Sequence, residues 1–106
     1  MPWEIFFKAS AEKEFRRLPR EVQRRFANAF EALTEEPTRA RPGLDVKPLR
    51  GVKATWRLRV GDYRGIYEVE PGKVRFTRFG HRSNVYDVGF GNTSSVGRKL
   101  EPQGGI

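Results

Sequence analysis

The hydrophobic pattern at the start of the chain predicts a strand followed by a short helix. Residues 3–7, WEIFF, are apolar apart from one glutamate and rich in aromatic side chains, which favours a well-covered β-strand. Ser10 stands where a helix N-cap is expected, and Pro19 interrupts the helical pattern that follows it. The apolar positions of this pattern recur at spacings of four and three: Ala11, Phe15 and Leu18.

Residues 20–34 predict a second, longer helix, with apolar side chains on one stripe and charged and polar side chains outside it. The stripe consists of Val22, Phe26, Ala29, Phe30 and Leu33. Since one proline separates the two helical patterns, we expect a helical hairpin. From Glu35 to Pro48 the chain carries three prolines and a glycine without an apolar period, which is typical of a surface loop.

Residues 54–60, ATWRLRV, alternate strictly, as a strand with one core face and one basic face does. The core face holds Ala54, Trp56, Leu58 and Val60, and the other face holds Thr55, Arg57 and Arg59. Gly61 and Asp62 then supply a turn into a second strand at 63–69. Alternation in this second strand is poor, since Arg64 and Ile66 fall on the same side, and a central position in the sheet would explain that.

Pro71 and Gly72 occupy the central positions of a type II turn that leads into a further strand, VRFTRFG. Three antiparallel strands therefore form a meander. The whole pattern predicts an α+β fold in which the N-terminal strand and the helical hairpin pack on an antiparallel sheet of about four strands. We expect one domain over residues 2–88, and a flexible tail over 89–106 because that segment is rich in Gly, Ser and Asn. A segment that orders only against a partner is the alternative for this tail.

Charge is the strongest signal in the composition, because 21 Lys and Arg against 13 Asp and Glu give a net charge of +8. Fifteen of the basic residues are arginines, whose planar guanidinium matches phosphate oxygens bidentately. Nucleic acid is therefore favoured over a membrane surface as the partner. A basic surface that serves solubility, or a compositional bias of an Arg-rich or thermophilic genome, is the alternative.

The absence of cysteine and the presence of a single histidine argue against disulfides and the usual zinc sites, so we expect a site without metal or cofactor. No apolar run approaches the roughly 20 residues that span a bilayer. We therefore expect a soluble, cytoplasmic protein.

Six residues are candidates for a catalytic site on the basic face and at the end of the sheet: Arg57, Arg59, Arg64, His81, Arg82 and Tyr86. The first two lie about 6 to 7 Å apart on one strand, and Arg64 opens the next strand across a tight turn. The last three follow the final strand closely enough to converge on one end of the sheet. RNA suits such a site, since its 2′-hydroxyl can attack the adjacent phosphate without metal or cysteine.

In this reaction arginines stabilise the negative charge that develops on the phosphate, His81 moves protons near neutral pH, and Tyr86 stacks on a base. Each residue also has a structural interpretation. The strand arginines form a solvated face, His81 is a turn residue bonded to the backbone, Tyr86 is half-buried, and Arg64 pairs with Glu68.

The helical hairpin, the loop ending in PLRG at 48–51 and the stretch WRLRVGDYRGIYEV together resemble the RelE/ParE superfamily of bacterial and archaeal toxins. The segment FGHRSNVY at 79–86 is similar to that family's C-terminal signature. The resemblance covers residues 3 to about 88. It implies a curved sheet and the toxin of a type II toxin–antitoxin pair that acts as an endoribonuclease on ribosome-bound mRNA.

By position, the resemblance carries site roles to the same six residues, with further RNA contacts expected at Arg50, Lys53 and Arg78. It also implies an acidic or amphipathic antitoxin as partner, in a toxin–antitoxin hetero-oligomer. RelE has lysines where this chain has Arg57 and Arg59, and arginine is practically never deprotonated. Proton abstraction would then fall to His81, a ribosomal group or solvent. A ParE-like inhibitor of DNA gyrase without catalysis and a plain RNA-binding module are the alternative functions.

Overall fold

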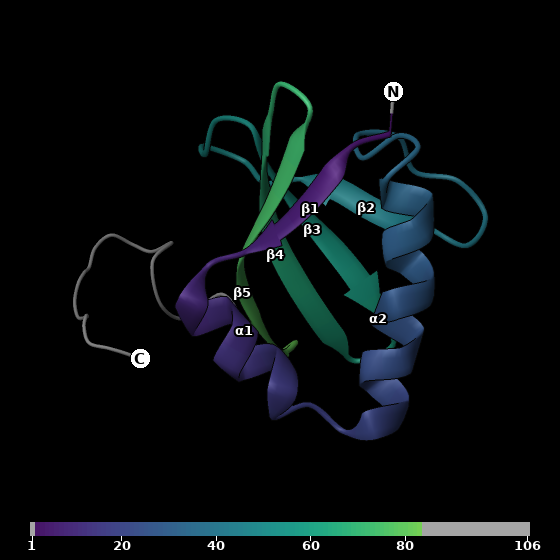
Figure 1. Cartoon of the computed structure of the whole chain (residues 1–106), viewed down its shortest axis with the longest axis vertical. Helices are drawn as coiled ribbons and strands as arrows, with labels where there is room; N and C mark the ends of the chain where they lie inside the picture. The colour runs from purple at the N-terminus through teal and green to yellow at the C-terminus, as the bar shows by residue number, and fades with distance from the viewer. Residues whose placement is uncertain (1, 84–106) are drawn as a thin grey trace.

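The computed structural model describes residues 2–83, which form two helices and one five-stranded sheet (Figure 1). In chain order the elements are β1 (Glu4–Phe7), α1 (Ala9–Arg16), α2 (Arg20–Leu33), β2 (Asp45–Pro48), β3 (Thr55–Val60), β4 (Tyr63–Glu70) and β5 (Lys73–His81). The order in the sheet is β1-β5-β4-β3-β2, with β1 parallel to β5 and all other pairs antiparallel. The α+β prediction is confirmed; the expected tail and Tyr86 lie outside the described residues. Within 2–83, neither helix is long and apolar enough to cross a bilayer.

The structure has one strand that the sequence did not predict, β2. It replaces part of the expected loop at 35–48, so that prediction was wrong for residues 45–48. Val46 is buried opposite Leu58 of β3, while the side chains on either side of Val46 are exposed. Pro48 is tolerated because β2 is an edge strand, where an amide donor can be missing. Four residues with one buried side chain are too few to show a period in the sequence.

Two predictions for the N-terminal part need correction. Helix α1 begins at Ala9, with Lys8 in the N-cap position and no side-chain capping bond, so Ser10 lies inside the first turn. Strand β1 is an edge strand rather than a well-covered one, and the Phe6 side chain is 44% exposed. The ammonium of Lys73 lies 5.7 Å from the centre of the Phe6 ring. This cation–π contact favours an aromatic side chain at this exposed position.

Both helices pack on one face of the sheet, which we call the inner face. The core between them includes the α2 stripe as predicted, with Phe30 only half-buried at its margin. Aromatic rings from β1, both helices and β5 meet there with centroids 4.9 to 6.4 Å apart. Ala54 does not join this core, contrary to the prediction, because it precedes β3 with a positive φ of 55° and is exposed.

Strand β5 contains a bulge that decides which of its side chains face the helices. Ile66 pairs with Arg78 and Tyr67 pairs with Phe76, so Thr77 is an extra residue between two paired positions. The bulge therefore turns both Phe76 and Phe79 inward, although they are three positions apart, an odd spacing that regular alternation would place on opposite faces. Their rings stack with centroids 4.9 Å apart and planes 17° apart.

Gly65 in the central strand β4 makes room for this stack. A Cβ atom at Gly65 would lie 2.9 Å from ring atoms of both Phe76 and Phe79, closer than packed atoms tolerate. From α1, a carboxylate oxygen of Glu14 accepts the backbone N–H of Phe79 at 2.9 Å. The helix thus satisfies a donor next to the bulge and holds the end of β5 in place.

Tyr67 ties the centre of the sheet to the segment after α2. Its hydroxyl donates to the carbonyl of Pro37 at 2.6 Å, and both residues are fully buried. Burial also raises the pKa of the Tyr67 phenol, which keeps it a donor at all physiological pH values. The guanidinium of Arg41 donates to the carbonyls of Ala32 and Glu36, which satisfies the C-terminal end of α2.

Replacing Tyr67 by Phe is expected to lower the free energy of unfolding by about 1–3 kcal/mol, because the buried Pro37 carbonyl loses its donor. Chemical denaturation followed by circular dichroism measures this change. Tyr63→Phe, at a half-buried tyrosine of the same strand, is the matched control and should change stability less. Equal effects of the two substitutions would show that the Pro37 bond contributes nothing.

Candidate nucleic-acid interface

The register of the sheet places the strand arginines on the face opposite the helices, which we call the outer face. Arg57 pairs with Ile66, and Arg59 pairs with Arg64, so these four side chains share one face. Arg64 and Ile66 do lie on the same side, and β4 is the central strand, as its poor alternation suggested. The basic face predicted from residues 54–60 is therefore present.

Arg59 and Arg64 converge on the turn between β3 and β4. The Nε of Arg59 donates to the Gly61 carbonyl at 3.4 Å, and the Nη1 of Arg64 donates to the same carbonyl at 3.1 Å. Arg64 also donates to the carbonyl of its neighbour Tyr63 at 3.2 Å. Arg64 therefore bonds to these two carbonyls rather than to Glu68, the partner that the structural alternative gave it. One carbonyl oxygen thus holds two guanidinium groups close together.

Arg82 joins the same turn from the end of β5. Its backbone N–H donates to the Asp62 carbonyl at 2.7 Å, and its Nε lies 3.8 Å from a carboxylate oxygen of Asp62. The side chain is 63% exposed, so it remains accessible to a ligand. We call Arg59, Arg64 and Arg82 the turn cluster. Three guanidinium groups at one hairpin turn carry the kind of donors that a phosphate accepts, and the Asp62 carboxylate offsets part of the charge of Arg82.

Arg57 differs from the turn cluster because it is held within the sheet. Its side chain is 13% exposed and its Nη1 lies 3.2 Å from Asp45 on the adjacent strand β2. The other carboxylate oxygen of Asp45 is 3.9 Å from Arg59. Asp45 therefore offsets part of the charge of two arginines, and Arg57 has the less accessible guanidinium of the two.

His81 lies at the same end of the sheet as the turn cluster but on the inner side. It pairs with Tyr63, and the two rings meet edge to face with centroids 5.4 Å apart. Its Nδ1 accepts the backbone N–H of Ser83 at 3.1 Å and lies 2.9 Å from the Ser83 hydroxyl. The neutral ring therefore carries its proton on Nε2. The bulge in β5 explains this placement, since strict alternation through Thr77 would turn the ring outward.

The three expected RNA contacts are spread along the sheet. Arg50 and Lys53 are exposed in the loop that precedes β3, at the opposite end of that strand from Gly61. Arg78 lies on the outer face of β5, opposite Ile66 and between the two ends. Only part of the expected constellation is thus brought together at the turn.

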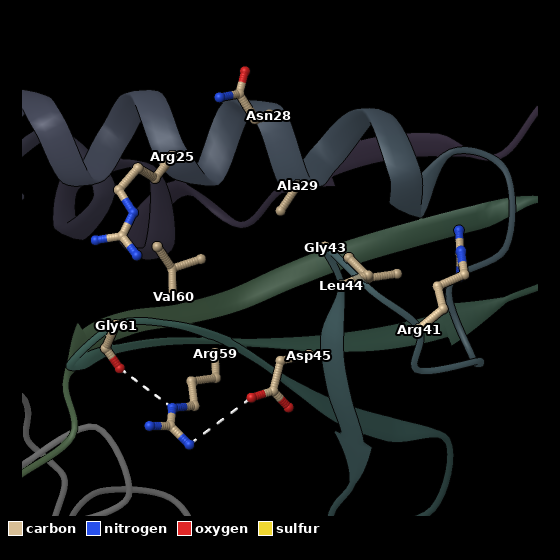
Figure 2. A pocket seen from close by; sticks show the side chains of 10 residues that line it. All are labelled: Arg25, Asn28, Ala29, Arg41, Gly43, Leu44, Asp45, Arg59, Val60 and Gly61. Atoms are coloured by element: carbon tan, nitrogen blue, oxygen red, sulfur yellow. Dashed lines mark hydrogen bonds and ion pairs between the residues drawn. The ribbon is translucent and has the colours of Figure 1, made fainter.

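Arg25 of α2 is a further cation at the turn, which the sequence pattern placed among the solvated positions of the helix. Its Nη1 would lie 3.3 Å from a Cβ atom at Gly61. A pocket of about 320 Å³ opens here between α2 and the strands β2 and β3 (Figure 2). Only the meeting of α2 with the β3–β4 turn reveals Arg25, so no local pattern in the sequence could have indicated it.

A family model described as ParE toxin of type II toxin-antitoxin system, parDE, matches residues 5–86. The curated protein Toxin RelE3 of Methanocaldococcus jannaschii is 28% identical over 83 residues, which cover 78% of this chain and 94% of that protein.

Solved structures with the same fold include two antitoxin–toxin complexes. The RelB-RelE complex from Methanococcus jannaschii matches with a TM-score of 0.66 and 27% identity, over 77% of this chain and 95% of the other. The RelBE2 complex from Mycobacterium tuberculosis matches with a TM-score of 0.65 and 29% identity, over 77% of this chain and all of the other. These matches span nearly the whole of the related chains.

The substitution Arg59→Thr is expected to leave stability unchanged or to raise it by about 0.5 kcal/mol at low salt. It removes a like charge directly opposite Arg64 and loses only weak contacts. Denaturation at low and at high salt tests this, because screening should abolish any gain. The control Arg57→Thr should destabilise, since Asp45 then loses its nearer partner. A clear loss of stability in Arg59→Thr would contradict this account.

Proposed function

The chain belongs to the ParE toxin family and is the RelE-like toxin of a type II toxin–antitoxin system, and we propose that it is a metal-independent endoribonuclease that cleaves ribosome-bound mRNA. The turn cluster is the observation that carries this proposal. Arg59 and Arg64 are held by a common carbonyl before any substrate arrives, so little reorganisation is needed when charge develops on a phosphate.

In this mechanism the RNA supplies its own nucleophile. The 2′-hydroxyl oxygen attacks the adjacent phosphorus, the bond from phosphorus to the 5′-oxygen breaks, and a 2′,3′-cyclic phosphate is left. The turn cluster binds the non-bridging oxygens of the phosphorane. Arginines stabilise this charge without taking up a proton, because they stay protonated throughout.

His81 suits the role of proton donor to the leaving 5′-oxygen. It donates as the imidazolium, whose Nδ1–H can bond the Ser83 hydroxyl oxygen 2.9 Å away while the Nε2 proton is transferred, so that the neutral imidazole remains after the step. Abstraction of the 2′-hydroxyl proton then falls to a ribosomal group or to solvent. This division fits a chain with arginines, and no lysine, at positions 57 and 59.

We further propose that an antitoxin covers the outer face in the cell. The related structures from two organisms are toxins in complex with antitoxins. A net charge of +8, with three arginines gathered at one turn, favours an acidic segment as the neutralising partner.

The decisive experiment adds the purified protein to a chelator-treated translating extract and maps mRNA ends by primer extension. Wild-type protein should produce new ends within reading frames, and Arg82→Ala should reduce their yield by about a hundredfold or more. Arg24→Ala is the matched control, since Arg24 is an exposed arginine of α2 that pairs with Glu21 rather than with the turn. His81→Ala should also cut less, because it removes the proposed proton donor.

Two results would redirect the assignment. The matching family is described as ParE toxin, and a ParE-like inhibitor of DNA gyrase is the alternative function. If mRNA stays intact and DNA gyrase is inhibited, gyrase inhibition would replace the proposed nuclease activity. Binding of RNA without new ends would indicate a plain RNA-binding module. Equal cutting by wild-type, Arg82→Ala and Arg24→Ala protein would show that the turn cluster is not the site.

A further inference from the structure

Arg25 lies at the β3–β4 turn but, among the described residues, makes no interaction that stabilises the fold. It projects from α2 toward Gly61, and its Nη1 is the nearest side-chain atom to the position that a Cβ of Gly61 would take. No hydrogen bond or ion pair joins Arg25 to another residue within 2–83. Its neighbour Arg24, in contrast, lies 3.7 Å from Glu21. An exposed guanidinium held against a backbone turn is available to bind an anion.

The pocket beside Gly61 supplies the rest of this site (Figure 2). Ala29, Leu44 and Val60 supply apolar lining, and two arginines lie near Gly61, Arg25 from α2 and Arg59 from β3. A volume of about 320 Å³ falls at the lower end of the range for small-ligand pockets, which is roughly 300–1,000 Å³. This room suits one sugar–phosphate unit better than a bulky ligand.

The other polar residues at the rim do not oppose an anion. The carboxylate of Asp45 is offset by Arg57 at 3.2 Å and Arg59 at 3.9 Å. Arg41 is occupied by backbone carbonyls of the α2 end, although its charge still contributes to the field. The side chain of Asn28 points away from the pocket in Figure 2.

From these contacts we infer that Arg25 and the adjoining pocket form a second phosphate site, which holds a backbone phosphate of the RNA strand beside the one that is cut. The inference rests on the proposed function and adds the course that the RNA strand takes over the protein surface. Continuity favours RNA over a partner's carboxylate, because Arg59 belongs to the turn cluster and also lines the pocket, and Gly61, whose carbonyl accepts from Arg59 and Arg64, lines it too. One polyanion can therefore run from Arg82 across Arg59 to Arg25.

Binding of an uncleavable strand tests this site separately from catalysis. A fluorescent 2′-O-methyl RNA oligonucleotide is titrated with protein at several salt concentrations, and log Kd is plotted against log salt. Loss of one phosphate contact should lower the slope by about 0.7 for a single strand. We expect this change in Arg25→Gln and no change in Arg24→Gln. Arg25→Lys should restore the slope, because it restores the charge.

The outcomes separate the two proposals. An unchanged slope in Arg25→Gln, an equal change in Arg24→Gln, or no binding by the wild type would each overturn the second phosphate site. If mRNA is still cut by the wild type in that case, the proposed function stands without it. A lower slope in Arg25→Gln with mRNA left intact would support the site and refute the nuclease. Thermal unfolding of Arg25→Gln should match that of the wild type, since Arg25 is exposed.

Discussion

The bulge at Thr77 is the constraint on which both faces of the sheet depend. Without it, strict alternation would point Phe79 toward solvent and His81 toward the outer face. With it, Phe76 and Phe79 stack over Gly65 and complete the aromatic core. The same shift of one residue turns His81 inward, against Tyr63. Core packing and the placement of the candidate proton donor are therefore settled by one inserted residue.

Much of the fold could be predicted because its signals are local. The α2 stripe and the alternation of 54–60 each repeat often enough to identify the element and its buried face. Strand β2 could not be recognised, because it is short and gains its order from pairing with β3. The faces of β5 beyond Thr77 could not be assigned either, since a bulge breaks the period without leaving a mark in the sequence.

The site was predictable to the same extent as the strand that carries it. Arg57 and Arg59 could be placed on one face from their spacing alone, and Arg64 could be placed nearby from the tight turn. The different exposure of Arg57 and Arg59 could not be predicted, because Asp45 contacts Arg57 from β2, a strand that no sequence pattern indicated. Arg25 depends on how α2 crosses the sheet edge, which is a property of packing rather than of periodicity.

The turn cluster brings like charges together, and these charges contribute little to the stability of the fold. Arg59 faces Arg64 directly, and such pairs cost stability unless a ligand offsets them. The Gly61 carbonyl compensates only in part, because one oxygen serves two guanidinium groups. Any anion that binds the folded protein alone raises its stability through mass action. A site of this kind therefore favours occupation by an anion, and under the proposed function an RNA strand and an acidic partner would compete for the same few arginines.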